Sequence, residues 1–142
     1  MTTPFSAYYD PSSLRAGDTD LIARSITVLS GASLASGALI EGVASTAPTT
    51  VLPRGTVLGR ITASDKYIPS IATASDGSQI PSAILATPLD PSAGDTIGPA
   101  YFHGEFAGEK LSYDASWTAA TIEKALRVAG TLIEIRTLGS LG

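Results

Sequence analysis

The sequence of 142 residues contains no cysteine and a single histidine, His103. Disulfide bonds and thiolate metal sites are therefore excluded, and one histidine cannot build a histidine-based zinc site. No run of about 18 apolar residues is present, so we expect no transmembrane helix and no membrane partner. Residues 1–5 have neither the basic start nor the apolar block of a signal peptide. We therefore expect the protein to be made and kept in a cytosol-like space, or to be released by lysis.

Charged and aromatic residues are also scarce, at 15% and 6% of the chain. The net charge is −4, whereas a nucleic-acid partner would favour a basic face, so we expect no such partner. Hydrophobic residues reach 44%, but many of them are alanine, which contributes little buried area. We expect a core of this kind to give a marginally stable monomer, for which oligomerisation is a natural remedy.

The sequence predicts an N-terminal arm followed by one β-rich domain. The arm is residues 1–20, where Pro4, Pro11 and Gly17 interrupt any regular pattern, and the domain is residues 21–142. Three aromatic residues on the arm are candidates for contact with a partner, and packing against the chain's own domain is an equally weighted alternative. These candidates are Phe5, Tyr8 and Tyr9.

Short apolar stretches between turn residues predict the strands of the domain. We place them at 21–29, 39–43, 56–61, 67–71, 83–86, 97–106 and 131–136. Pro69 predicts that its strand lies at a sheet edge, and Gly59 indicates a bulge or a close backbone approach. The stretch at 45–50, rich in Ser, Thr, Ala and Pro, is predicted to be a linker.

One helix is predicted near the C-terminus, because apolar residues recur there at helical spacing. The residues of this stripe are Ile122, Ala125, Leu126 and Ala129. Ser116 or Thr118 can cap the start of the helix, Gly130 can end it, and Glu123 and Arg127 form an i,i+4 pair. The fold class is therefore α+β and β-rich, with short strands, tight turns and one short C-terminal helix.

No residue pattern in the sequence indicates catalysis or a bound cofactor. As a general base, His103 would need an orienting carboxylate and a nucleophile, and nothing in the sequence brings a nucleophile to His103 and Glu105. Four aspartates stand beside Gly, Ser or Pro, where Asp forms turn hydrogen bonds, and their spacing fits no calcium loop. They are Asp65, Asp76, Asp90 and Asp95. We expect no enzymatic activity, no cofactor and no metal site.

Three aromatic residues of the domain are candidates for packing or for an interface between copies. Trp117, the only tryptophan, stands at the predicted helix start. Core packing is the slightly favoured role for it, with an interface anchor as the alternative. Tyr101 and Phe102 are adjacent, so they face opposite sides of a strand, and one can be buried while the other meets a partner.

An ordered series of short motifs runs through the second part of the chain. The motifs are 52–59 (LPRGTVLG), 76–78 (DGS), 83–85 (AIL), 95–96 (DT), 101–106 (YFHGEF) and 122–135 (IEKALRVAGTLIEI). Over roughly residues 50–136, their order and spacing resemble the head decoration proteins of tailed bacteriophages, the family of phage lambda head protein D.

The resemblance implies a structural role without enzymatic activity or cofactor. It implies a homotrimer on the outer surface of an expanded phage head, bridging neighbouring major capsid proteins and holding the shell against packaged DNA. We hypothesise that the arm, residues 1–20, adds extended backbone to an edge strand of the capsid protein. A carbohydrate- or receptor-binding module on a virion surface is the second hypothesis, and a small hydrolase using His103 is the third.

Overall fold

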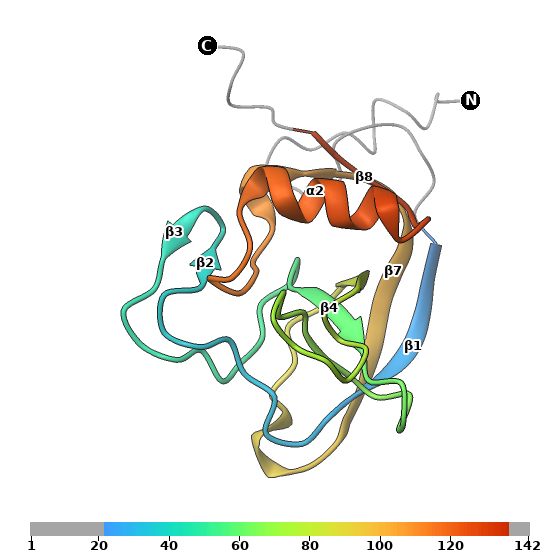
Figure 1. Ribbon diagram of the computed structural model, residues 1–142. Coiled ribbons are helices and arrows are strands. Elements are labelled where there is room, and N and C mark those ends of the chain that lie inside the picture. The colour runs from blue at the N-terminus through green and yellow to red at the C-terminus, as the bar shows by residue number, and fades with distance from the viewer. Residues whose placement is uncertain (1–21, 137–142) are drawn as a thin grey trace, which may run out of the picture.

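The computed structural model describes residues 22–136 as a β-rich domain with one α-helix (Figure 1). The strands are β1 (Ile22–Val28), β2 (Leu39–Ile40), β3 (Val43–Ala44), β4 (Val57–Arg60), β5 (Tyr67–Pro69), β6 (Pro81–Leu85), β7 (Thr96–Ala107) and β8 (Leu132–Arg136). The α-helix is α2 (Ala119–Val128), and the short 3-10 helices are η1 (Pro91–Ala93) and η2 (Gly108–Lys110). The predicted β-rich α+β fold class is confirmed.

Six of the strands form one sheet, in the order β1-β5-β4-β6-β7-β8. β1 also pairs with β7 in antiparallel orientation along its whole length. The strands β1, β5, β4, β6 and β7 therefore close into a small barrel, in which β5 joins β1 only where Tyr67 lies opposite Val28. β8 pairs in parallel with the second half of β7 and lies outside this ring. β2 and β3 form a separate hairpin.

A β-bulge in β7 changes which face of the sheet its side chains occupy. Ala23 of β1 lies opposite Tyr101 and Ile22 lies opposite His103, so β7 has one extra residue in this interval. Side chains alternate along a strand, so the extra residue changes which ones face α2. Before the bulge the odd-numbered residues of β7 face α2, and after it the even-numbered residues do. Tyr101 and Phe106 therefore reach the same face, with ring centroids 5.7 Å apart.

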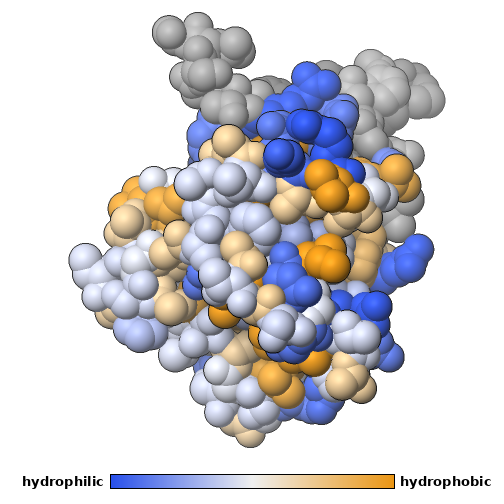
Figure 2. Space-filling view, in the orientation of Figure 1, coloured by the Kyte–Doolittle hydropathy of each residue, from blue (hydrophilic) through white to orange (hydrophobic). Residues whose placement is uncertain are grey.

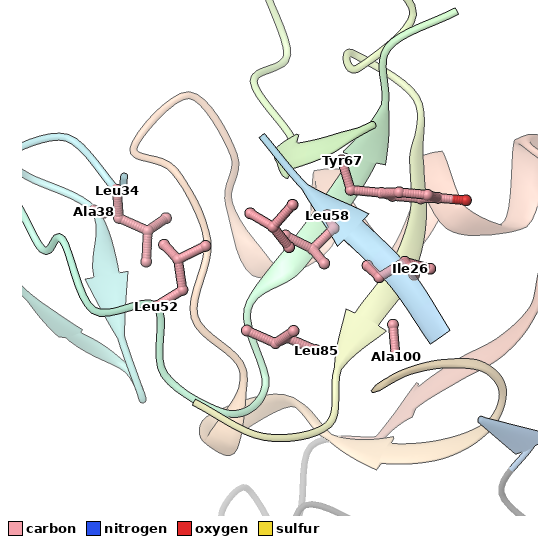
Figure 3. Packing of buried hydrophobic residues seen from close by; sticks show 10 residues of the cluster. Ile26, Leu34, Ala38, Leu52, Leu58, Tyr67, Leu85 and Ala100 are labelled. Atoms are coloured by element: carbon pink, nitrogen blue, oxygen red, sulfur yellow. The ribbon is translucent and has the colours of Figure 1, made fainter. Parts of the chain in front are cut away.

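Two hydrophobic clusters pack against the two faces of the sheet. The barrel cluster contains Ile26, Val28, Leu34, Ala38, Leu52, Leu58, Tyr67, Ala83, Leu85 and Ala100 (Figure 3). The helix cluster, beneath α2, contains Val57, Ile84, Phe106, Leu111, Tyr113, Trp117, Ile122, Leu126 and Ile133. Neighbouring residues of one strand separate between them: Ile84 belongs to the helix cluster and Leu85 to the barrel cluster, as the two-residue period of a strand requires.

Gly59 of β4 lies where the sequence indicated a bulge or a close approach, and both are present. The pairing of β4 with β6 shifts register between Leu58 and Gly59. A Cβ atom at Gly59 would lie 2.2 Å from the carbonyl oxygen of Ser78. The backbone of the segment before β6 therefore occupies the space that a side chain would need.

The prediction of a single strand at 39–43 is wrong. Glu41 and Gly42 have φ angles of 50° and 85°, and the chain reverses there to form the β2–β3 hairpin. Two successive residues with positive φ make a tight hairpin turn, which usually has Asn or Asp at its first position. Glu41 is not a residue that signals such a turn, so the sequence pattern resembled one continuous strand.

The predicted linker at 45–50 is part of the domain. Leu34 and Thr49 exchange two backbone hydrogen bonds, of 3.0 and 2.8 Å, and the amide of Ser45 donates to the carbonyl of Ala38 at 2.8 Å. The strand predicted at a sheet edge from Pro69 is also placed differently, because β5 lies between β4 and β1. Pairing with β1 ends at Tyr67, so Pro69 itself pairs with β4 only.

The helix prediction is confirmed at both ends. Thr118 Oγ1 accepts from the amide of Thr121 at 3.2 Å, and the Thr118 amide donates to Thr121 Oγ1 at 2.8 Å, which is a reciprocal capping box. Ser116, the other candidate cap, instead accepts from the amide of Ala72 at 2.9 Å. Gly130 follows the helix with a φ angle of 77°, the left-handed conformation expected at that position.

Candidate interaction surface

The arm candidates Phe5, Tyr8 and Tyr9 lie outside the described residues. Their role, and the boundary between arm and domain, stay predictions. The described surface begins at Ile22, the first residue of β1, and ends with β8.

Trp117 lies in the helix cluster, with only 8% of the residue exposed. Its indole Nε1 donates to the carbonyl of Ser70 at 3.0 Å. The hydroxyl of Ser70 in turn donates to the carbonyl of Ser78 at 2.7 Å. These two buried bonds connect the segment before α2 to the segment between β5 and β6.

Tyr101 and Phe102 face opposite sides of β7, as predicted from their adjacency. Tyr101 packs against the helix cluster through Phe106. Phe102 packs against the barrel cluster, edge-on to Tyr67 with ring centroids 6.1 Å apart. The guanidinium of Arg24 lies 5.5 Å from the centroid of the Phe102 ring, in cation–π contact. Burial raises the pKa of the Tyr67 phenol.

A pocket of about 490 Å³ lies along β1, beside the rings of Tyr67 and Phe102. Its lining is Arg24, Ser25, Ile26, Thr27, Arg60, Asp65, Tyr67 and Phe102, and we call it the Arg24 notch. Asp65 is the one carboxylate among the residues that line the pocket, and it forms an ion pair with Arg60. Arg24 therefore has no carboxylate partner among the described residues. Arginine and aromatic side chains are the types enriched at the energetic centres of protein interfaces.

Beyond the bulge, β7 and β8 present a surface of mixed charge on the side away from α2. His103 lies opposite Leu132, and Glu105 lies opposite Glu134. Two facing carboxylates would repel one another. Arg136 offsets this repulsion, because its Nε lies 3.0 Å from Glu105 Oε1.

His103 lies half-buried on this strand surface, in a pocket of about 280 Å³. Among the described residues that line the pocket, Thr131 carries the single hydroxyl. Thr131 Oγ1 donates to the carbonyl of Leu126 at 2.9 Å. The arrangement therefore does not supply the activated nucleophile that hydrolysis would need.

Two of the four aspartates, Asp76 and Asp90, make the predicted turn hydrogen bonds, whereas Asp65 and Asp95 form ion pairs with Arg60 and Lys66. Asp76 accepts from the hydroxyl and the amide of Ser78, at 2.5 and 3.0 Å, and the hydroxyl bond holds the pKa of Asp76 below its ordinary value. Ser92 lowers the pKa of Asp90 in the same way. Within residues 22–136, no group of three or more His, Asp or Glu residues is arranged to hold a metal ion. In the same residues no helix is long and apolar enough to span a membrane.

Exposed apolar side chains are distributed over several elements rather than gathered in one patch. The large ones are Val43, Val51, Ile80, Ile97, Val128 and Leu132. On the face drawn in Figure 2, hydrophobic residues form small separate groups between hydrophilic ones. An interface of this domain is therefore expected to depend on strand edges, the Arg24 notch and specific polar contacts more than on one broad apolar surface.

Comparison with protein families relates the chain to a known class of protein. Residues 14–132 match the family described as bacteriophage lambda head decoration protein D, which is most of the 142-residue chain. The chain belongs to this family. A search of curated proteins found no match. As a lambda-type head decoration protein, it is a structural component of a phage virion that associates with the capsid.

The matched span also shows that the decoration-protein family covers more of this chain than its motifs indicated. The motifs run over roughly residues 50–136, whereas the family match begins at residue 14, within the predicted arm. β1 and the β2–β3 hairpin therefore lie within the part of the chain that matches the family.

Proposed function

We propose that this protein is a cementing protein. It forms a homotrimer on the outer surface of an expanded phage head and stabilises the shell by bridging neighbouring major capsid proteins. The observation that carries this proposal is the family match over residues 14–132. In this role it is made in the host cytoplasm, and its partners are the major capsid protein and two further copies of itself.

The composition supports this location on the virion. A net charge of −4 disfavours contact with the packaged genome, which is itself anionic. Binding of many copies to one lattice makes the total stabilisation a sum over sites, so a modest affinity per trimer is sufficient. No enzymatic activity and no cofactor is part of this role.

Within the proposed role, the arm is the segment that contacts the capsid protein. Phe5, Tyr8 and Tyr9 act as anchors, while extended backbone of residues 1–20 pairs with an edge strand of the capsid protein. Tyr101 and Trp117 serve packing beneath α2, and the half-buried Phe102, beside Arg24, is the candidate for an interface.

The decisive experiment is co-sedimentation of the purified full-length protein with expanded and with unexpanded heads. The expected result is saturable binding to expanded heads only, together with a higher temperature of shell rupture. Equal binding to both forms, or binding without any gain in shell stability, would contradict the cementing function.

The arm is tested separately by deleting residues 1–20 and by replacing Phe5, Tyr8 and Tyr9 together with alanine. Both variants should keep the native fold and lose most of the affinity for expanded heads. His103→Ala is a matched control on the domain, and it should bind as the wild type does. If the truncated protein binds with unchanged affinity, the arm is not the anchoring segment.

The alternative of a carbohydrate- or receptor-binding module would need several aromatic residues on one exposed face. Among the described residues, Tyr67, Phe106, Tyr113 and Trp117 are buried in the two clusters. Tyr101 and Phe102 lie on opposite faces of β7. No observation favours this alternative.

A further inference from the structure

The six-stranded sheet has two strand edges that remain unpaired within residues 22–136. β1 pairs with β7 along one edge, but along the other edge it meets β5 only at Val28, so the edge of residues 22–27 is open. In Figure 1, β1 lies at the margin of the fold beside β7. β8 pairs with β7 along one edge and with no other described strand. Open edges present backbone donors and acceptors to which another strand can add.

The open edge of β1 carries backbone groups that point away from β7, toward the side on which β5 lies. The amide of Leu29 donates to the carbonyl of Tyr67 at 3.0 Å, so Leu29 faces the β5 side. In a strand the backbone groups of alternate residues point to the same edge. Ala23, Ser25 and Thr27 therefore present amide and carbonyl groups to the open edge.

The opposite strand gives the same orientation independently. Ser25 lies opposite Pro99 of β7, and the carbonyl of Pro99 accepts from the amide of Ala86 at 3.0 Å, on the far side of β7. Ser25 and Pro99 therefore form a pair without mutual hydrogen bonds. This also explains how β7 accommodates a proline, and it leaves the backbone groups of Ser25 available to another strand.

This edge lacks the features by which proteins usually protect an exposed strand. Natural edges are commonly blocked by proline or by several charged side chains. Along 22–27, the only charged residue is Arg24, and its guanidinium lies over Phe102 in the notch described above. Ala23 and Ser25 are small and exposed.

We propose that, in the homotrimer, β1 of one copy pairs in antiparallel orientation with β8 of the next copy, with Arg24 opposite Glu134. This inference rests on the proposed homotrimer and names its interface. A cyclic trimer joins two different surfaces of each copy head to tail, and the sheet provides two different open edges. Within one copy, β1 runs antiparallel to β7 and β8 runs parallel to β7, so β1 and β8 point in opposite directions. Rotation about a three-fold axis parallel to the strands keeps these directions, and β1 of one copy is therefore antiparallel to β8 of the next.

Charge complementarity determines the register of this pairing. Arg24 lies opposite Ala100 of the barrel cluster, and Glu134 lies opposite Glu105, so both side chains are on the face away from α2. Both residues are exposed, and neither has an ion-pair partner among the described residues. Pairing them across the interface joins two opposite charges on one face of a continuous sheet.

Disulfide trapping tests the pairing directly, because the native chain contains no cysteine. Directly opposite residues of antiparallel strands have Cα atoms about 4.5–5.5 Å apart, within the range of a disulfide. Within one copy, Arg24 and Glu134 lie on either side of β7, roughly 10 Å or more apart, which no disulfide can span. Mild oxidation of the full-length double variant Arg24→Cys, Glu134→Cys should therefore give covalent trimers on a non-reducing gel.

The controls are the two single variants and the pair Arg24→Cys, Glu123→Cys. Glu123 is a carboxylate on α2, where it lies 3.6 Å from Arg127, and it should not cross-link to position 24. Covalent trimers from this control pair in the same yield would mean non-specific oxidation and would overturn the inference.

A charge exchange provides a second measurement, made by native mass spectrometry over a dilution series. Arg24→Glu should weaken trimer formation about ten-fold per interface, since it replaces attraction with repulsion. Adding Glu134→Arg in the same chain should restore the wild-type value to within about two-fold. Ser25→Pro removes an edge amide and should also weaken the trimer, whereas Ser25→Ala should not.

The outcomes separate this inference from the function on which it rests. If the wild-type protein is trimeric but the double-cysteine variant gives no covalent trimer and Arg24→Glu leaves the trimer unchanged, the β1–β8 pairing is wrong and the cementing trimer stands. If the protein is monomeric both in solution and on heads, the homotrimer itself fails. If trimers form only on heads, oxidation of head-bound variants gives the same decision.

Discussion

Replacement of Gly59 with alanine should strongly destabilise the domain. The added Cβ atom would lie 2.2 Å from the carbonyl oxygen of Ser78 and 2.8 Å from its carbonyl carbon and Cα atom. These are backbone atoms, which cannot rotate aside as the end of a side chain can. Gly59 is also paired with β5 at Ile68 and with β6 at Pro81, so neither strand can move without disturbing the sheet.

The size of the destabilisation follows from the contacts that the displaced backbone of Ser78 makes. Overpacking of a tight interior costs about 1–3 kcal/mol. Displacement of Ser78 also breaks the 2.7 Å bond that its carbonyl accepts from the hydroxyl of Ser70, at a further cost of about 1 kcal/mol. We expect Gly59→Ala to lower the free energy of unfolding by about 3 kcal/mol, a large fraction of the roughly 5–15 kcal/mol typical of a domain. The melting temperature should fall by about 6–12 °C.

The assay is unfolding in guanidinium chloride, monitored by the fluorescence of Trp117, the only tryptophan. All variants are compared at one protein concentration, because self-association would add a concentration-dependent term. Gly94→Ala is the matched control, since its Cβ would meet nothing within 4 Å and its φ of 163° is ordinary extended backbone. It should change stability by less than about 0.5 kcal/mol. Equal unfolding midpoints for Gly59→Ala and Gly94→Ala would refute the reasoning.

Three further substitutions test the helix cap at Thr118, the buried hydrogen bond of the Trp117 indole and the acidic side chain of Asp95. Trp117→Phe leaves the carbonyl of Ser70 without its donor and should cost about 2 kcal/mol. Because this variant lacks the tryptophan signal, its unfolding and that of the wild type are followed by circular dichroism, and an unchanged midpoint would contradict the prediction. Thr118→Ala should cost about 1 kcal/mol, while Thr118→Ser should retain most of the cap. A hydrogen bond from Lys66 is the main cause that lowers the pKa of Asp95 in the folded protein. The ionised Asp95 therefore stabilises the fold fully at pH values above its pKa in the unfolded chain, about 3.9, and this stabilisation is lost as the pH falls through its lower pKa in the folded protein. The stability difference between wild type and Asp95→Asn should therefore shrink between pH 5 and pH 2.

The elements that could be predicted from the sequence are those determined by neighbouring residues. The helix was predictable because its apolar stripe, its cap at Thr118 and its terminating Gly130 all lie within one short stretch. Gly59 was also informative, because a glycine inside a strand pattern has few structural explanations. The opposite orientations of Tyr101 and Phe102 follow from strand alternation alone.

The features that could not be predicted depend on contacts between distant segments. The turn at Glu41 and Gly42 was missed because Glu is an uncommon residue at positive φ. The segment at 45–50 was interpreted as a linker from its composition, although its bonds to residues 34–38 make it part of the domain. The contact of Arg24 with Phe102 was missed because the one signal of Arg24, a charge on the face shared by Ile26 and Val28, indicated only an imperfect strand.

The bulge in β7 determines which side chains of this strand pack in the core and which face the candidate interfaces. β6 occupies one edge of β7 up to Tyr101, and β8 continues along that edge from His103. Without the extra residue, Glu105 would face the apolar underside of α2, and Phe106 would face the opposite side. The bulge therefore allows one strand to complete the barrel, support the helix and turn Glu105 and its neighbour Glu134 outward. Because β7 lies between the two open edges, a change that shifts its register would alter the core and both edges together.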